Sequence, residues 1–125
     1  MAIFMPTKLR AAFNEEMQQA KLLYRQGQYP SSFQHLERAH VLGQRHYIPH
    51  VINHYWMLKI GVRRRDLREI FGQALRIIGS AGSLIGWIPV GNTGGANVSP
   101  IKPMAIPPDL AHFFDEHSPN AHTHE

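Results

Sequence analysis

The chain has 125 residues, which is the size of one domain with a core of its own. Hydrophobic residues make up 43% and charged residues 18%, a balance that is typical of folded proteins and excludes an intrinsically disordered chain. Because there is no cysteine, disulfides, thiolate metal ligands and a cysteine nucleophile are excluded as well. The net charge of +4 is a modest excess, whereas nine histidines are an unusual number, and a bound metal ion would need nitrogen, oxygen or thioether ligands.

Two helices are predicted in the first third of the chain. The first begins at Thr7, whose hydroxyl can cap a helix N-terminus, and ends near Gly27. Its apolar residues recur at spacings of three and four: Leu9, Phe13, Met17, Ala20 and Tyr24. Pro30 suits the first turn of the second helix, which ends at Gly43. The second helix has its own inward stripe of Phe33, Leu36, Ala39 and His40, so the pair should form an antiparallel hairpin.

Two more helices are predicted before the composition changes. The third begins at Pro49 and ends near Gly61. Its expected inward stripe is Val51, Tyr55, Leu58 and Val62. The fourth begins at Asp66, which forms a capping box with Glu69, and continues to Gly86. Its stripe is Ile70, Phe71, Ala74, Leu75, Ile78, Ala81 and Ile85.

Beyond Gly86 the sequence is rich in glycine, proline and asparagine and has no sustained helical period. We predict an all-α fold in which residues 1–86 form a four-helix antiparallel bundle. An extended Gly/Pro-rich arm, residues 87–117, should pack across the helices and end in a helical turn or two from Asp109 to His117. Residues 118–125 are expected to be a disordered tail.

No segment is suited to secretion or membrane insertion. The N-terminal stretch MAIFMPTKLR lacks the apolar run of a signal peptide, and its charges follow its apolar residues. The most apolar stretch, Ile77 to Val90, is interrupted by glycines and by Pro89, so it falls short of the roughly 20 apolar residues that a membrane span requires. We therefore expect a cytoplasmic protein with no membrane partner.

Two resemblances accompany these patterns. The stretch AKLLYRQGQYPSSFQHLERAHVL (20–42) resembles a single tetratricopeptide repeat, which implies a helical hairpin but, without further copies, no peptide-binding array. The chain also resembles a family of small bacterial proteins that form a domain of unknown function. That resemblance implies no activity, and it is carried by HLERAHVLGQRH (35–46), the His50 and His54 pair, RRRDLREIFGQALR (63–76) and PVGNTGGANVSPIKPM (89–104).

Four histidines gather around the connection between the second and third helices. His50 and His54 are four residues apart and lie on one face of the third helix, and Met57 lies on the same face. His40 is on the inward face of the second helix, and His46 lies in the connection. Imidazole suits zinc, copper or nickel, and a thioether adds some preference for Cu(I). We predict a transition-metal site with ligands from this set: His40, His46, His50, His54, Glu37 and Met57.

Other interpretations of these residues stay open. A buried His40 can donate to a backbone carbonyl with no metal present. The chain is alternatively an interaction adaptor without a cofactor, in which the hairpin and the basic turn hold a protein partner or a second copy. A third interpretation is a small metal-dependent enzyme with Glu37 as the general base. A di-iron carboxylate bundle fits worse, because only Glu37 and His40 have the required Glu-x-x-His spacing.

Two further segments are candidates for ligand binding. Basic residues cluster before the fourth helix, whose N-terminus favours an anion or an acidic partner: Arg63, Arg64, Arg65 and Arg68. A solvated surface is the simpler explanation, and nucleic acid is not expected because no recognition motif accompanies the charge. The GNTGG segment (91–95) lacks the lysine of a phosphate-binding P-loop, so its glycines favour tight turns. If the arm folds over the histidines, Asn92 and Thr93 are placed to orient a cofactor or ligand.

Overall fold

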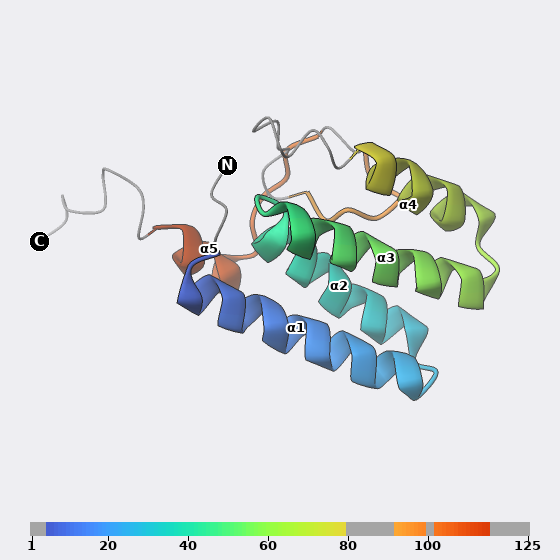
Figure 1. Ribbon diagram of the computed structural model, residues 1–125, viewed down its shortest axis with the longest axis horizontal. Helices are drawn as coiled ribbons and strands as arrows, with labels where there is room; N and C mark the ends of the chain where they lie inside the picture. Colours follow the sequence, from blue (N-terminus) through green and yellow to red (C-terminus); the bar gives the residue numbers. More distant parts are fainter. Residues whose placement is uncertain (1–4, 80–91, 100–101, 116–125) are drawn as a thin grey trace, which may run out of the picture.

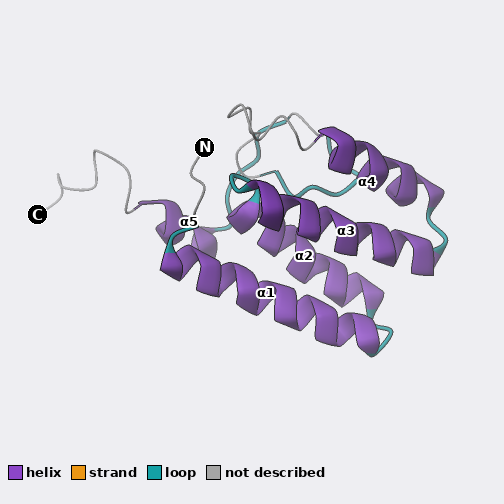
Figure 2. Cartoon of the chain, viewed as in Figure 1, coloured by secondary structure: helices purple, strands orange, loops and turns teal. Residues whose placement is uncertain are grey.

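The computed structural model describes residues 5–79, 92–99 and 102–115, which contain helices, turns and loops but no strand (Figure 2). This confirms the all-α class for that part of the chain. The predicted end of the fourth helix at Gly86, residues 87–91 of the arm and the tail 118–125 lie outside the described residues. The helices are α1 (Thr7–Arg25), α2 (Tyr29–Gly43), α3 (Tyr47–Arg64), α4 (Leu67–Gly79) and α5 (Pro108–Asp115).

The first hairpin forms as its apolar pattern predicts. The buried residues of α1 are Leu9, Phe13, Met17 and Ala20. Gly27 adopts a φ of +74°, a left-handed conformation that glycine reaches without strain, and this turns the chain from α1 into α2. Ser32 is fully buried against α1, where its hydroxyl donates to the Ala20 carbonyl at 2.6 Å. A small polar residue therefore lets the two helices approach closely while its hydrogen bond is satisfied.

The apolar core lies among α1, α2, α3 and α5. Successive helices from α1 to α4 run in alternate directions (Figure 1), and each packs mainly on its neighbour in the sequence. Leu110 brings α5 into the same core. Arg38 of α2 links α1 and α5 at the edge of this core. Its guanidinium donates to Asp109 of α5 at 2.5 Å and to Glu16 of α1 at 2.8 Å. None of the helices that the structure describes is both long and apolar enough to cross a membrane.

The predicted inward face of α3 is wrong. Tyr55 and Val62 of the expected stripe are 51% and 55% exposed. The buried face instead carries Asn53, His54, Met57, Ile60 and Gly61. Asn53 accounts for part of this difference between the predicted and the observed face of α3, since its amide donates to the Leu36 carbonyl of α2 at 2.8 Å. A polar side chain with a partner inside the fold can be buried without the usual penalty.

The predicted inward face of α4 is also wrong. Phe71, Leu75 and Ile78 are 66%, 68% and 76% exposed, so the apolar stripe faces away from the other helices that the structure describes. Gln73 is the buried residue of α4. Hydrophobic periodicity finds a helix through its spacing, but polar contacts can decide which face turns inward.

The described part of the arm packs on helices of its own chain. Val98 accepts a hydrogen bond at 2.7 Å from the guanidinium of Arg76 in α4. The backbone N–H of Ala96 donates to the carboxylate of Glu69 in α4 at 3.2 Å. In Figure 1 the orange segment of the arm lies beside α3 and α4. These contacts bring the glycine-rich segment to the histidines of α2 and α3.

Candidate metal centre

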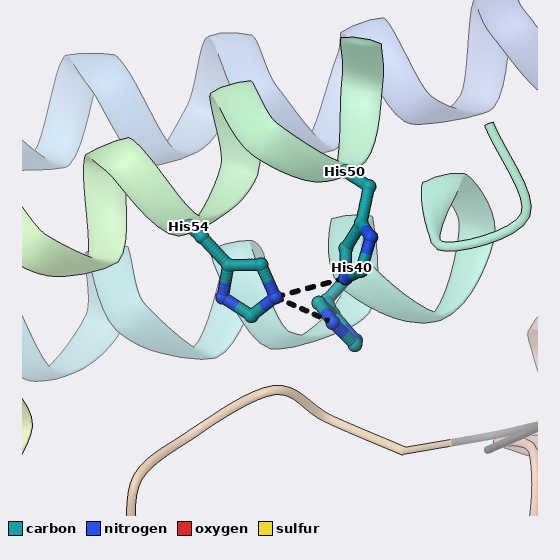
Figure 3. Close-up of side chains that lie close together, drawn as sticks. All are labelled: His40, His50 and His54. Atoms are coloured by element: carbon teal, nitrogen blue, oxygen red, sulfur yellow. Dashed lines mark hydrogen bonds between the residues drawn. The ribbon is translucent and has the colours of Figure 1, made fainter. Parts of the chain in front are cut away.

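Three histidines from two helices converge on one point in the structure. His54 Nε2 lies 3.1 Å from His40 Nε2 and 2.9 Å from His50 Nε2 (Figure 3). One ligand atom from each of the three lies within 4.8 Å of the others. His50 and His54 stack on α3 because they are one helical turn apart, and His40 faces them from the last turn of α2. We call His40, His50 and His54 the histidine triad.

The hydrogen bond of His40 fixes which ring nitrogen carries the proton. His40 Nδ1 lies 2.5 Å from the backbone carbonyl oxygen of Asn92, which can only accept. Nδ1 is therefore the protonated nitrogen of the neutral ring. As a result, the lone pair of His40 Nε2 points into the triad.

His54 is fixed in the same tautomer by Gln73. The side-chain amide of Gln73 donates to Glu69 Oε1 at 2.6 Å and to the Gly94 carbonyl at 2.8 Å. With both amide hydrogens used, Gln73 Oε1 accepts from His54 Nδ1 at 2.6 Å. His54 Nε2 therefore also presents a lone pair to the triad. Partners of this kind on the outer nitrogen are a common feature of metal-binding histidines.

Burial keeps the triad uncharged. It lowers the pKa of His50 to about 4 and is the largest cause of the lowered pKa of His54, about 3. The pKa of His40 is also well below its ordinary value, first because of burial and then because of the other two histidines. The Nε2 atoms of His40 and His54 face each other with their lone pairs. A proton shared between these two atoms would relieve the repulsion, but the lowered pKa values disfavour it. A metal ion satisfies both, since a tetrahedral ion with zinc–nitrogen bonds of about 2.0–2.1 Å spaces its ligands by about 3.3 Å.

The glycine-rich segment is built around His40. Gly94 has a φ of +81°, and a Cβ atom there would lie 2.5 Å from His40 Cδ2. The buried Asn92 side chain holds the segment in place by donating to the carbonyls of Ser99 and Lys102 at 2.7 and 2.8 Å, while its oxygen accepts from the Gly94 N–H at 2.9 Å. Asn92 thus acts on the site through its backbone carbonyl, as a support for a histidine.

The sequence pattern of a family described as protein of unknown function (DUF3703) matches residues 7–114. The chain belongs to this family. The match covers the triad together with Gln73, Asn92 and Gly94. No curated protein and no solved structure matches the chain. For this DUF3703 protein, the geometry of the site is therefore the basis for a function.

Three other predicted ligands of this DUF3703 protein lie outside the triad. His46 occupies the N-cap position of α3, where its extended backbone, φ −120° and ψ 122°, takes it off the helical face of His50. Met57 is fully buried in the apolar core. Glu37 lines a separate pocket of about 190 Å³. Burial, and secondly the charge of Glu69, raise the pKa of Glu37. Thr93, predicted to orient a ligand, lines another pocket with Glu37.

The predicted basic cluster divides among different neighbours. Arg63 donates to the Tyr24 hydroxyl at 3.1 Å, on the side of α1. Arg64 lines the same pocket as Glu37. Arg65 forms the left-handed C-cap of α3 with a φ of 54°, and Arg68 is exposed on α4. Arg65 therefore has a structural role in the turn between α3 and α4. None of the four arginines belongs to the triad.

The residues that sequence reasoning missed are the supports of the triad. Gln73 links His54 to Glu69 and to the arm, and Gly94 makes room for the His40 ring. The sequence signal for Gln73 is a spacing of four from Glu69, which is typical of a solvated helix face. Gly94 carries the signal of a turn. Neither signal points to a histidine that is far away in the chain.

Proposed function

We propose that this protein binds one transition-metal ion through the Nε2 atoms of the histidine triad. The observation that carries the proposal is the meeting of the His40 and His54 lone pairs at 3.1 Å, each fixed by a hydrogen bond on the opposite ring nitrogen. An all-imidazole set suits zinc, copper and nickel in their divalent states. Because the imidazoles are neutral at pH 7, the protein loses no net proton when a metal enters. Within the triad, the His50 Nε2–H that donates to His54 Nε2 at 2.9 Å has to move to the unpartnered Nδ1 of the same ring.

A role in handling or tolerance of such a metal in the cytoplasm fits the surroundings of the triad. The apolar core among α1, α2, α3 and α5 is formed by hydrophobic side chains alone, so we expect the fold to form without a metal, unlike small zinc domains. The triad is therefore suited to reversible loading. Glu37, the predicted general base of an enzyme, lies outside the triad, which favours binding over metal-dependent catalysis.

Elemental analysis tests the proposal directly. The untagged protein is purified without chelating resin, equilibrated with zinc, copper or nickel, and dialysed. We expect one ion per chain and a rise in the melting temperature, since a ligand at one hundred times its dissociation constant stabilises by about 2.7 kcal/mol. His54→Ala should lose the ion, whereas His112→Ala, an exposed histidine of α5, should keep it. No bound metal and no thermal shift in the parent protein would overturn the proposal.

The exposed stripe of α4 favours a second candidate, association with a second copy of the chain. Phe71, Leu75 and Ile78 follow the spacing of four and three that forms a seam between two helices. Such a pair would remove the apolar stripe from water.

Sedimentation at several protein concentrations tests this second candidate. We expect a dimer that Phe71→Glu dissociates, because the substitution places a charge within the seam. Leu22→Glu is the matched control, since Leu22 is an exposed apolar residue on α1. A protein that stays monomeric at every concentration, or a dimer that Phe71→Glu leaves intact, would contradict the candidate.

A further inference from the structure

The histidine triad offers no negative charge to offset that of a divalent ion. The three imidazoles are neutral ligands, and none of the carboxylates that the structure describes joins their group. Glu69 reaches the triad only through the neutral amide of Gln73. A divalent ion bound here would therefore keep both of its positive charges in a largely buried place, and unbalanced buried charge is costly.

Arg76 of α4 brings a positive charge to the arm segment that supports the triad. Its guanidinium donates to the Val98 carbonyl at 2.7 Å and to the Gly72 carbonyl at 3.2 Å, and its Nε is buried without a hydrogen-bond partner. Gly72 directly precedes Gln73, which supports His54, and Val98 belongs to the same segment as Gly94, which packs on His40. Arg76 cannot bind the metal itself, because a guanidinium has no lone pair to offer. It can, however, stabilise an anion beside the metal.

Three nitrogens also leave the coordination of the ion unfinished. Zinc and related ions with three histidine ligands take a fourth ligand from outside the protein. His50 is the least buried member of the triad and marks the side that faces solvent. Its Nδ1 is buried and has no hydrogen-bond partner, whereas the Nδ1 atoms of His40 and His54 each have one.

Resting on the proposed function, we infer that the divalent ion on the triad takes a small inorganic anion as its fourth ligand. The anion would be a dissolved monovalent anion, such as a halide or azide, that takes the place of a bound water molecule. Its negative charge would offset the charge of the metal, and the guanidinium of Arg76 would add a second attraction. The site is thus an anion-accepting metal centre.

Cobalt(II) and sodium azide test this inference, because the visible spectrum of cobalt(II) responds to each change of ligand. The cobalt-loaded full chain is titrated with azide at constant ionic strength. We expect a saturable spectral change at one azide per metal. Arg76→Gln should weaken azide binding several-fold, whereas Arg76→Lys, which keeps the charge, should weaken it less. An azide affinity of Arg76→Gln equal to that of the parent protein would show that Arg76 does not attract the anion.

The outcomes separate the two claims. If cobalt binds with a tetrahedral spectrum that a large excess of azide does not alter, the anion inference is overturned and the metal proposal stands. If cobalt does not bind, the metal proposal fails and takes the inference with it. His46→Gln and Met57→Leu should leave the azide-free spectrum unchanged. A changed spectrum in either variant would show that the protein itself supplies the fourth ligand.

Discussion

Acidifying the metal-free protein should destabilise it through the histidine triad. In the unfolded chain His50 and His54 take up protons as the pH falls below their ordinary pKa of 6.5, whereas burial lowers the pKa to about 4 and about 3 in the folded protein. The unfolded state is therefore the one stabilised by acid. The contribution of the neutral histidines is complete above pH 6.5 and is lost as the pH falls through the window from 6.5 to about 4 and about 3.

The size of the effect follows from the width of that window. One pH unit is worth about 1.4 kcal/mol per group. At pH 5 each of the two histidines thus lowers the free energy of unfolding by about 2 kcal/mol, or about 4 kcal/mol together. His40, whose pKa is also lowered, acts in the same direction. A loss of this size is a large share of the 5–15 kcal/mol that stabilises a typical domain.

Urea unfolding followed by circular dichroism, with a chelator present, measures this loss between pH 7 and pH 5. His50→Gln removes one titrating group, so its loss should be smaller than that of the parent by about 2 kcal/mol. Gln is chosen because its amide can donate to His54 Nε2 as His50 Nε2 does, and because His50 Nδ1 has no hydrogen-bond partner. His112→Gln, on α5, should keep the parent pH dependence. A stability that is flat from pH 7 to pH 5, or an unchanged loss in His50→Gln, would refute neutral burial of the triad.

Three substitutions test the supports of the triad without changing a ligand. Gln73→Leu removes the acceptor of the His54 N–H and should lower zinc affinity by about 10–100-fold in a competition titration with a chelating dye; unchanged affinity would contradict a supporting role. Gly94→Ala places a methyl group 2.5 Å from His40 Cδ2 and should lower both zinc affinity and the melting temperature. A Gly94→Ala protein equal to the parent in both would show that the segment does not fix His40. Asn92→Ala removes hydrogen bonds to Ser99, Lys102 and Gly94 and should speed amide exchange in residues 92–99, as hydrogen-exchange mass spectrometry can measure; unchanged exchange would argue against Asn92 as the anchor of the arm.

The positions of the helices could be predicted from the sequence because the signals are local. The Asp66 cap with Glu69, the proline at the start of α2 and the glycine between α1 and α2 each act within a few residues of their own position. Likewise, His50 and His54 were predicted to share a face because helical spacing alone puts them there.

The inward faces of α3 and α4 could not be predicted, because their cause is not local. Apolar spacing favoured Tyr55 and Phe71, yet the structure turns Asn53 and Gln73 inward, where each finds a partner on another element. No single-helix pattern contains those partners. The stripe left exposed on α4 is the consequence, and it motivates the test of self-association.

The ligand set shows the same division between local and distant causes. His46 is four residues before His50, and a continuous helix would have stacked it with the triad. Because α3 begins at Tyr47, His46 has an extended backbone and leaves that face. His40 was expected to face inward, but its partner Asn92 is 52 residues away and could not be identified from spacing.

X-ray absorption on the zinc-loaded protein tests the metal centre most directly, because it counts the imidazoles around the ion. We expect three imidazole nitrogens at about 2.0 Å and one further light atom. His54→Ala should lose this signal, and His46→Gln should retain it. A zinc shell of mostly oxygen atoms, or an unchanged shell in His54→Ala, would contradict a metal centre on His40, His50 and His54.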